Sequence, residues 1–327
     1  TVVEYLQQFF LNIYGRSSTL AVYLADPFNR KVIASAIIVF FGVVHIIGVR
    51  TGSAVQNVLT VLKVAIILAM IGFGAYMVDW SQASRLVAAY DAPPSSGPTG
   101  VPVMGLALLI IMFSYAGWNG ASYMAGEIKN PERNLPRALL LGTIVTSVMY
   151  LLLNVVFLLS APGEALMGQK AIGAVATRYL FGPAVSNFFT LAIALILLSS
   201  ISVEIMIGPR VYYAMARDRM LFHVLGSVSD RFQTPAFAIV LQVALSIFYV
   251  MVGNSTILME YMGFALSIFP VLTVIGLMYL RRKHPEIPRP FKVPLYPLTP
   301  LVFILLSLFM LGAGFLAWTS TSKFALL

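Results

Sequence analysis

Residues 112–127 read MFSYAGWNGASYMAGE, and they interrupt an apolar stretch that begins at residue 102 as PVMGLALLIIMF. Ala116, Gly117, Asn119 and Gly120 stand in the middle, and apolar side chains return after them. Glycine permits the backbone angles that an unwound turn needs. Polar backbone groups freed by a break in a membrane helix are tolerated only where they face protein or a water-filled cavity. The stretch therefore predicts either a broken helix at a binding site or a place where two helices pack closely on small residues.

The composition of the whole chain indicates a membrane protein. Hydrophobic residues make up 59% of the 327 residues and charged residues 10%, with a mean hydropathy of +0.90. A soluble domain carries roughly 25% charged residues. Eight apolar runs are each long enough to cross about 30 Å of hydrocarbon as a helix: 32–49, 54–78, 103–125, 139–160, 184–207, 236–252, 257–280 and 301–318. We therefore expect an all-α polytopic membrane protein with about eight full transmembrane helices, and residues 1–14 are interpreted as the possible end of another span.

The formal charge of +9 follows the predicted topology. If the loop after residue 125 is cytoplasmic, the cytoplasmic loops hold 13 Lys and Arg residues and the opposite side holds 7, while Lys63 stands alone inside a span. This bias matches the positive-inside rule. We therefore expect no nucleic-acid partner, and we expect the basic segments 129–137, 210–231 and 281–292 in the cytoplasm.

Motifs for other functional classes are missing from the sequence. There is no HExxH, no GxSxG and no pair of aspartates inside a span, so we expect neither an enzyme nor a metal site or cofactor. His45 has no second ligand at metal spacing and is interpreted as a packed or cavity histidine. No loop resembles a selectivity filter, which disfavours an ion channel. Thr1 stands where an initiator methionine would be, so the chain is interpreted as a fragment or a truncated form.

Three stretches, in order, resemble one family. FSYAGWNGASYMAGEIKNPERNLPRAL at 113–139 resembles the sixth span and following loop of the amino acid/polyamine/organocation (APC) superfamily, in particular its L-type amino acid transporter branch and bacterial relatives. GPRVYYAMARDRMLF at 208–222 resembles the loop after the eighth span, and YLRRKHPEIPRPFKVPLYP at 279–297 the loop after the tenth. The resemblance implies a five-plus-five inverted-repeat (LeuT-like) transporter fold that is only partial here, without its first two to three spans and its twelfth. It divides the chain into a remnant of the first repeat at 1–102, a complete second repeat at 103–280, and a cytoplasmic loop with the eleventh span at 281–327.

In this family the substrate lies between the broken first and sixth helices. By resemblance Phe113 matches an aromatic gate, and the carbonyls of Phe113, Ser114 and Ala116 are expected to face an ammonium group, which the partial negative charge of a helix C-terminus favours. Gly117 would permit the break. Trp118 is either a pocket wall or an ordinary packed aromatic, and Asn119 is either a pocket wall or a local cap on freed backbone.

Lys63 is the single charge deep in a predicted span, and an ionisable residue there suggests function. By resemblance it takes the place of a sodium ion, facing the eighth span, where Ser199 and Ser200 lie. The alternative is a lysine whose amine reaches the cytoplasmic interface. Glu127, Lys129 and Arg133 are interpreted either as a cytoplasmic gate or as a solvated charge run.

The resulting expectation is a secondary transporter that moves amino acids, favouring neutral ones, by alternating access, as a sodium-independent exchanger or a proton-coupled carrier. Its partners would be the small-molecule substrate and the lipid bilayer, with an accessory subunit left open, and its location a bacterial inner (plasma) membrane. The alternative is a non-transporting membrane subunit or receptor-like protein with the same fold.

Overall fold

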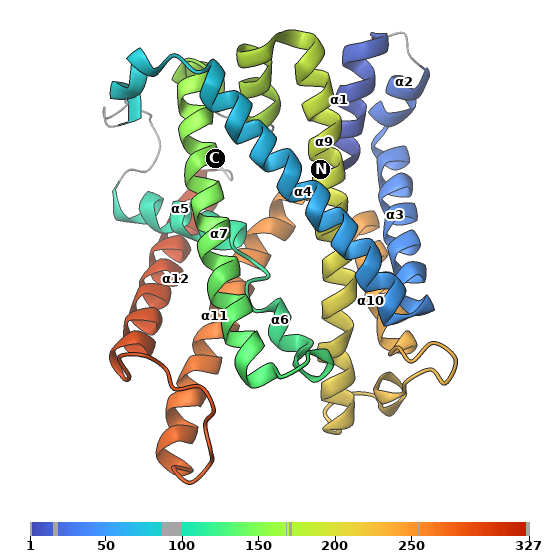
Figure 1. Ribbon diagram of the computed structural model, residues 1–327, viewed down its shortest axis with the longest axis vertical. Helices are drawn as coiled ribbons and strands as arrows, with labels where there is room; N and C mark the ends of the chain where they lie inside the picture. The colour runs from blue at the N-terminus through green and yellow to red at the C-terminus, as the bar shows by residue number, and fades with distance from the viewer. Residues whose placement is uncertain are drawn as a thin grey trace. The chain divides into compact units, whose positions relative to one another are not determined.

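The computed structural model describes residues 2–15, 19–86, 100–167, 169, 172–253 and 255–324, and every regular element among them is a helix (Figure 1). The chain divides into two compact units, each described separately below. The first unit comprises Thr1–Tyr90 with Leu140–Val252, and the second comprises Asp91–Leu139 with Gly253–Leu327. The all-α polytopic class predicted from the sequence is confirmed.

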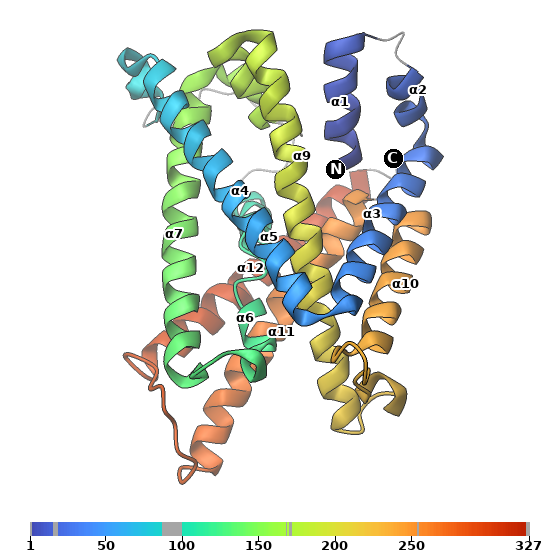
Figure 2. The same ribbon diagram turned by 45° about the vertical axis from the view of Figure 1, so that its right-hand side comes forward.

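The first unit is built on four long helices. Its elements are α1 (Val2–Tyr14), α2 (Thr19–Ala25), α3 (Pro27–Ile47), α4 (Val49–Met77), the 3₁₀ helix η1 (Trp80–Leu86), most of α7 (Pro131–Ser160), α8 (Gly163–Leu166), α9 (Ile172–Arg217), the 3₁₀ helix η3 (His223–Gly226) and α10 (Ala236–Val252). Helix α9 contacts α1, α3, α4 and α10, and α3 lies beside α10 in both views (Figures 1 and 2). Helix α9 is therefore the central element of this unit.

A small buried cluster joins three helices of the first unit. Ile38 and Phe41 of α3 meet Ile205 of α9 and Ile239 of α10, and each is less than 9% exposed. Close van der Waals packing of this kind associates helices in a bilayer, where lipid offers no hydrophobic gain. The Lys31 ammonium donates to the Met251 carbonyl at 2.7 Å and so joins the start of α3 to the end of α10.

The second unit holds the interrupted helix. It contains α5 (Val101–Ser114), α6 (Gly120–Tyr123), the 3₁₀ helix η2 (Ala125–Glu127), the first turns of α7, α11 (Ser255–Lys283) and α12 (Leu298–Phe324). Helix α5 packs against α11 and α12. Helices α5 and α12 approach each other closely at Gly105, where an added Cβ would fall on Ala313 of α12. A larger residue at position 105 would separate these two helices.

The described helices revise the predicted spans. Six are long and apolar enough to cross a membrane: Pro27–Ile47, Val49–Met77, Pro131–Ser160, Ile172–Arg217, Ala265–Lys283 and Leu298–Leu316. Ala236–Val252 is apolar but shorter, at 17 residues. The apolar run at 103–125 is divided into α5 and α6, as the broken-helix alternative expected. Within the segment 1–14, the described residues Val2–Tyr14 form a helix whose Val2 and Val3 are buried.

Helix ends extend beyond the apolar runs. Two segments predicted as loops are partly helical, because α7 already begins at Pro131 and α9 continues to Arg217. Arg and Met have good helix propensity, so a helix continues past the lipid boundary that hydropathy marks. Helix α9 also starts earlier than its apolar run and contains a break at Gly182, whose φ of 76° is left-handed. The division into inverted repeats stays a prediction, since the two compact units follow different boundaries.

Candidate functional site

The interrupted helix of the second unit is broken at the predicted place. Helix α5 ends at Ser114, residues 115–119 form turns, and α6 begins at Gly120. Gly117 has a φ of 88°, a left-handed conformation that costs an L residue about 1–2 kcal/mol and glycine almost nothing. The broken-helix prediction is confirmed as a feature of the backbone.

Through the break, backbone hydrogen bonds of turns take the place of the regular hydrogen bonds of an α-helix. The Tyr115 amide donates to the Ile111 carbonyl at 3.2 Å and the Ala116 amide to the Phe113 carbonyl at 3.0 Å. The Gly120 amide donates to the Gly117 carbonyl at 2.9 Å. A carbonyl oxygen has two lone pairs, so an oxygen that accepts one of these turn bonds can also accept from a second donor. The backbone here can therefore accept from an ammonium group while its turns remain intact.

Two side chains of the break have defined surroundings. Trp118 is 47% exposed, and the choice between a pocket wall and an ordinary packed aromatic stays a prediction. The Asn119 amide donates to the phenol oxygen of Tyr123 at 2.8 Å and caps no backbone group of α6. Asn119 therefore does not cap α6, and its role in a pocket wall stays a prediction. Tyr123 was not among the predicted site residues, although its i, i+4 spacing from Asn119 was the available signal.

Lys63 of α4 faces α9 in the first unit, as predicted. Its ammonium donates to the Ser200 hydroxyl at 3.4 Å, near the long limit for a hydrogen bond. Helix α4 begins at Val49, five residues before the predicted run, so Lys63 lies roughly 21 Å along the helix at 1.5 Å per residue. This depth favours a contact within the helix bundle over a reach to the interface.

Ser199 contacts a different residue from the one expected. Its hydroxyl accepts from the Gln56 amide at 3.3 Å, and both groups are buried. Gln56 is seven residues before Lys63, which places both on one face of α4, and sequence reasoning missed it. The Gln56 amide oxygen is itself buried without a hydrogen-bond partner.

A second buried polar contact joins α9 to another neighbouring helix, α3. His45 of α3 is 3% exposed, and its Nε2 lies 3.1 Å from the Ser202 hydroxyl of α9. A Cβ added at Gly52 of α4 would fall on the His45 ring, so the glycine makes room for the imidazole. His45 is a packed histidine, and no group of three potential metal ligands occurs among the described residues.

The candidate gate residues lie around the turn that starts α7. Glu127 belongs to η2, Lys129 and Asn130 form the turn, and Arg133 is in the first turn of the helix. The Asn134 amide donates to the Lys129 carbonyl at 2.6 Å, which fixes the turn. The side chains of all three predicted gate residues are exposed, so their role as a gate stays a prediction.

A cavity of about 380 Å³ lies elsewhere in the first unit and includes none of the predicted site residues. Its lining comes from the end of α4, η1, the end of α7 and the start of α9. The Asp79 carboxylate on its wall accepts from the Ser81 amide and the Gln82 side chain, both at 3.0 Å. The one carboxylate in the cavity wall therefore already accepts hydrogen bonds from its own turn.

Comparison with known proteins gives a consistent picture. A family model described as amino acid permease matches residues 1–324. The b(0,+)-type amino acid transporter 1 of Mus musculus is 31% identical over 86% of this chain and 57% of its own length. The serine/threonine exchanger SteT of Bacillus subtilis is 30% identical over 99% of this chain and 70% of its own length. The human cystine/glutamate transporter is 28% identical over 86% of this chain and 55% of its own length. The chain thus spans little more than half the length of two of these relatives.

Proposed function

The chain belongs to the amino acid permease family, and from this premise we propose that it is the core of a secondary transporter that moves amino acids across a membrane. The observation that carries the proposal is the break in the α5–α6 helix, with its left-handed Gly117. An interrupted backbone inside a bilayer requires a polar environment or a polar ligand. An α-ammonium group, common to all amino acids, is a suitable ligand for carbonyl oxygens at the end of a half-helix.

The proposed site consists of Phe113, Ser114, Ala116, Gly117, Trp118 and Asn119, to which we add Tyr123. In this role Phe113 covers the substrate and the backbone from 113 to 117 accepts from its ammonium group. The hydrogen bond between Asn119 and Tyr123 orients one wall of the pocket. We propose a neutral substrate, because residues 111–125 contain no Asp, Glu, Lys, Arg or His that would pair with a charged substrate side chain. The serine/threonine exchanger among the relatives supports this class.

Lys63 is proposed to supply a permanent positive charge where other carriers bind a sodium ion, making transport independent of sodium. Its contact with Ser200 supports this role, because the ammonium then joins α4 to α9 as a bound cation would. Ser199 contributes through Gln56, whose amide connects the same two helices. We further propose exchange as the mode of transport and a bacterial plasma membrane as the location, both supported by the relative from Bacillus subtilis.

Counterflow in proteoliposomes tests the proposal. Vesicles that contain the full-length protein are loaded with unlabelled serine, and entry of labelled serine, leucine, arginine or glutamate is followed in sodium-free buffer. We expect entry of the neutral amino acids only, and only into preloaded vesicles. Entry into empty vesicles driven by a proton gradient would replace exchange with proton coupling, and no entry of any amino acid would refute transport.

A further inference from the structure

The last three residues of α11 and the segment that joins it to α12, residues 281–297, are strongly basic and fold on themselves; we call them the basic loop. It reads RRKHPEIPRPFKVPLYP and holds five Lys and Arg side chains against one carboxylate, a net charge of +4 with histidine neutral. Five prolines in this short stretch restrict its backbone. The charge and the stiffness are both properties of the segment itself and owe nothing to the proposed transport site.

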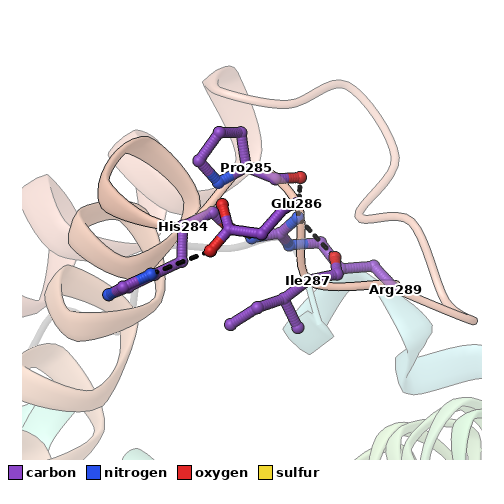
Figure 3. A network of polar contacts seen from close by, with 5 residues as sticks. All are labelled: His284, Pro285, Glu286, Ile287 and Arg289. Atoms are coloured by element: carbon purple, nitrogen blue, oxygen red, sulfur yellow. Dashed lines mark hydrogen bonds and ion pairs between the residues drawn. The ribbon is translucent and has the colours of Figure 1, made fainter.

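One arginine organises the beginning of the basic loop. The Arg289 guanidinium donates to the carbonyls of His284 at 2.7 Å, Ile287 at 2.8 Å and Pro285 at 3.1 Å (Figure 3). These contacts give a hydrogen-bond donor to three carbonyls of the turn that follows α11. Beside them the His284 Nδ1 lies 3.0 Å from a carboxylate oxygen of Glu286 (Figure 3). The single acidic side chain of the loop is thereby paired within the loop.

A second arginine closes the far end. The Arg281 guanidinium lies over the Tyr296 ring, 3.8 Å from its centroid, a cation–π contact. Arg281 and Arg289 therefore have structural partners inside the loop. The remaining cations, Arg282, Lys283 and Lys292, have exposed side chains, and the Lys283 ammonium lies 5.5 Å from the centroid of the Tyr279 ring.

Large apolar side chains are exposed beside these cations. Ile287 is 48% exposed, Phe291 55% and Leu295 77%. The loop starts directly after Leu280, the last apolar residue of α11, and ends directly before the apolar helix α12. Both ends of the basic loop therefore belong at the membrane–water interface, where exposed apolar side chains have acyl chains to enter.

We propose that the basic loop is a binding site for anionic lipid headgroups, with Arg282, Lys283 and Lys292 as the phosphate contacts and Phe291 as the inserted side chain. Basic residues directly after a membrane helix attract anionic lipid by about 1 kcal/mol each, which is roughly fivefold in association. The loss of all three charges should weaken the association roughly a hundredfold. Arg281 and Arg289 stabilise the conformation of the basic loop through contacts within it. Arg282, Lys283 and Lys292 can therefore bind headgroups without a change in that conformation.

The absence of cysteine allows a direct test. The full-length protein carrying Phe291→Cys with an environment-sensitive fluorophore is placed in bilayers of neutral phosphatidylcholine, with or without phosphatidylglycerol. We expect the fluorophore to move to an apolar environment only when the anionic lipid is present. Salt at about 1 M, where the Debye length is about 3 Å, should reverse the change. Inorganic phosphate at constant ionic strength should not reproduce it.

A matched pair of triple variants separates the basic loop from general surface charge. Arg282→Gln with Lys283→Gln and Lys292→Gln should abolish the fluorescence change. Arg217→Gln with Arg219→Gln and Arg231→Gln removes three exposed arginines from the first unit and should leave it intact. Equal fluorescence in neutral and anionic bilayers would overturn the proposal, as would equal effects of the two triple variants. The salt response of the unchanged loop decides the question if the first triple variant fails to fold.

Discussion

The sharpest perturbation of the proposed site is a side chain at Gly117. Its φ of 88° costs an alanine about 1–2 kcal/mol and a β-branched residue up to about 3 kcal/mol. An equilibrium constant changes tenfold for each ~1.4 kcal/mol. The broken conformation should therefore become about 5- to 30-fold less populated in Gly117→Ala and up to roughly 100-fold less populated in Gly117→Val. If transport requires the break, the initial rate of counterflow per folded molecule should fall by these factors. Gly142→Ala in α7 is the matched control, because an added Cβ there meets open space.

Two neighbouring changes separate backbone from side-chain roles. Ser114→Ala should have a mild effect, since the backbone is expected to bind the ammonium. Phe113→Ala should impair transport more than equilibrium binding, because closure over the substrate loses its aromatic cover. The reasoning is refuted if Gly117→Val lowers protein yield but leaves the rate per folded molecule near normal. That result would assign the glycine to helix packing alone.

Three further predictions concern other parts of the chain. Lys63→Ala should abolish or strongly impair transport with normal membrane insertion, while the unchanged protein works in sodium-free buffer; transport that stops without sodium would contradict the role of Lys63. Single cysteines in segments 129–137, 210–231 and 281–292 should resist an impermeant reagent added outside intact cells, and their labelling from outside would reverse the topology. Hydrogen bonds from its own backbone amide and from His284 hold the pKa of Glu286 below its ordinary value of 4.5. The contact should therefore stabilise the basic loop above pH 4.5 and lose its effect as the pH falls through the lowered pKa; carboxyl NMR giving a pKa of 4.5 or above would refute this.

The sequence predicted those features that depend on local chemistry. The break at 115–119 followed from glycines inside an apolar run, and the contact between Lys63 and α9 was expected from the resemblance to the APC superfamily. The partner of Ser199 was missed because it depends on helix rotation, whereas the partner of Asn119, four residues further on, could have been found from its spacing. Gln56 meets Ser199 only through the way α4 crosses α9, which no pattern within either helix specifies.

Helix ends were missed for a different reason. Hydropathy locates the lipid boundary, whereas a helix ends where its backbone loses partners or meets a residue that stops it. Residues 208–217 lie beyond the apolar run that predicts the lipid-embedded part of the helix, yet they still belong to α9. Positions of helix ends therefore needed the structure, and the classification as a polytopic membrane protein did not.

Hydrogen–deuterium exchange of the amides at 111–123, with and without substrate, tests the central claim most directly. The full-length protein would be measured in bilayers with saturating serine, and with a non-transported sugar as the control. We predict that serine slows exchange at 115–119, because binding closes a break that otherwise admits water, and that Gly117→Val removes this protection. Exchange at 115–119 that is equal with serine, with the sugar and without ligand would contradict the claim that the broken helix binds the amino acid.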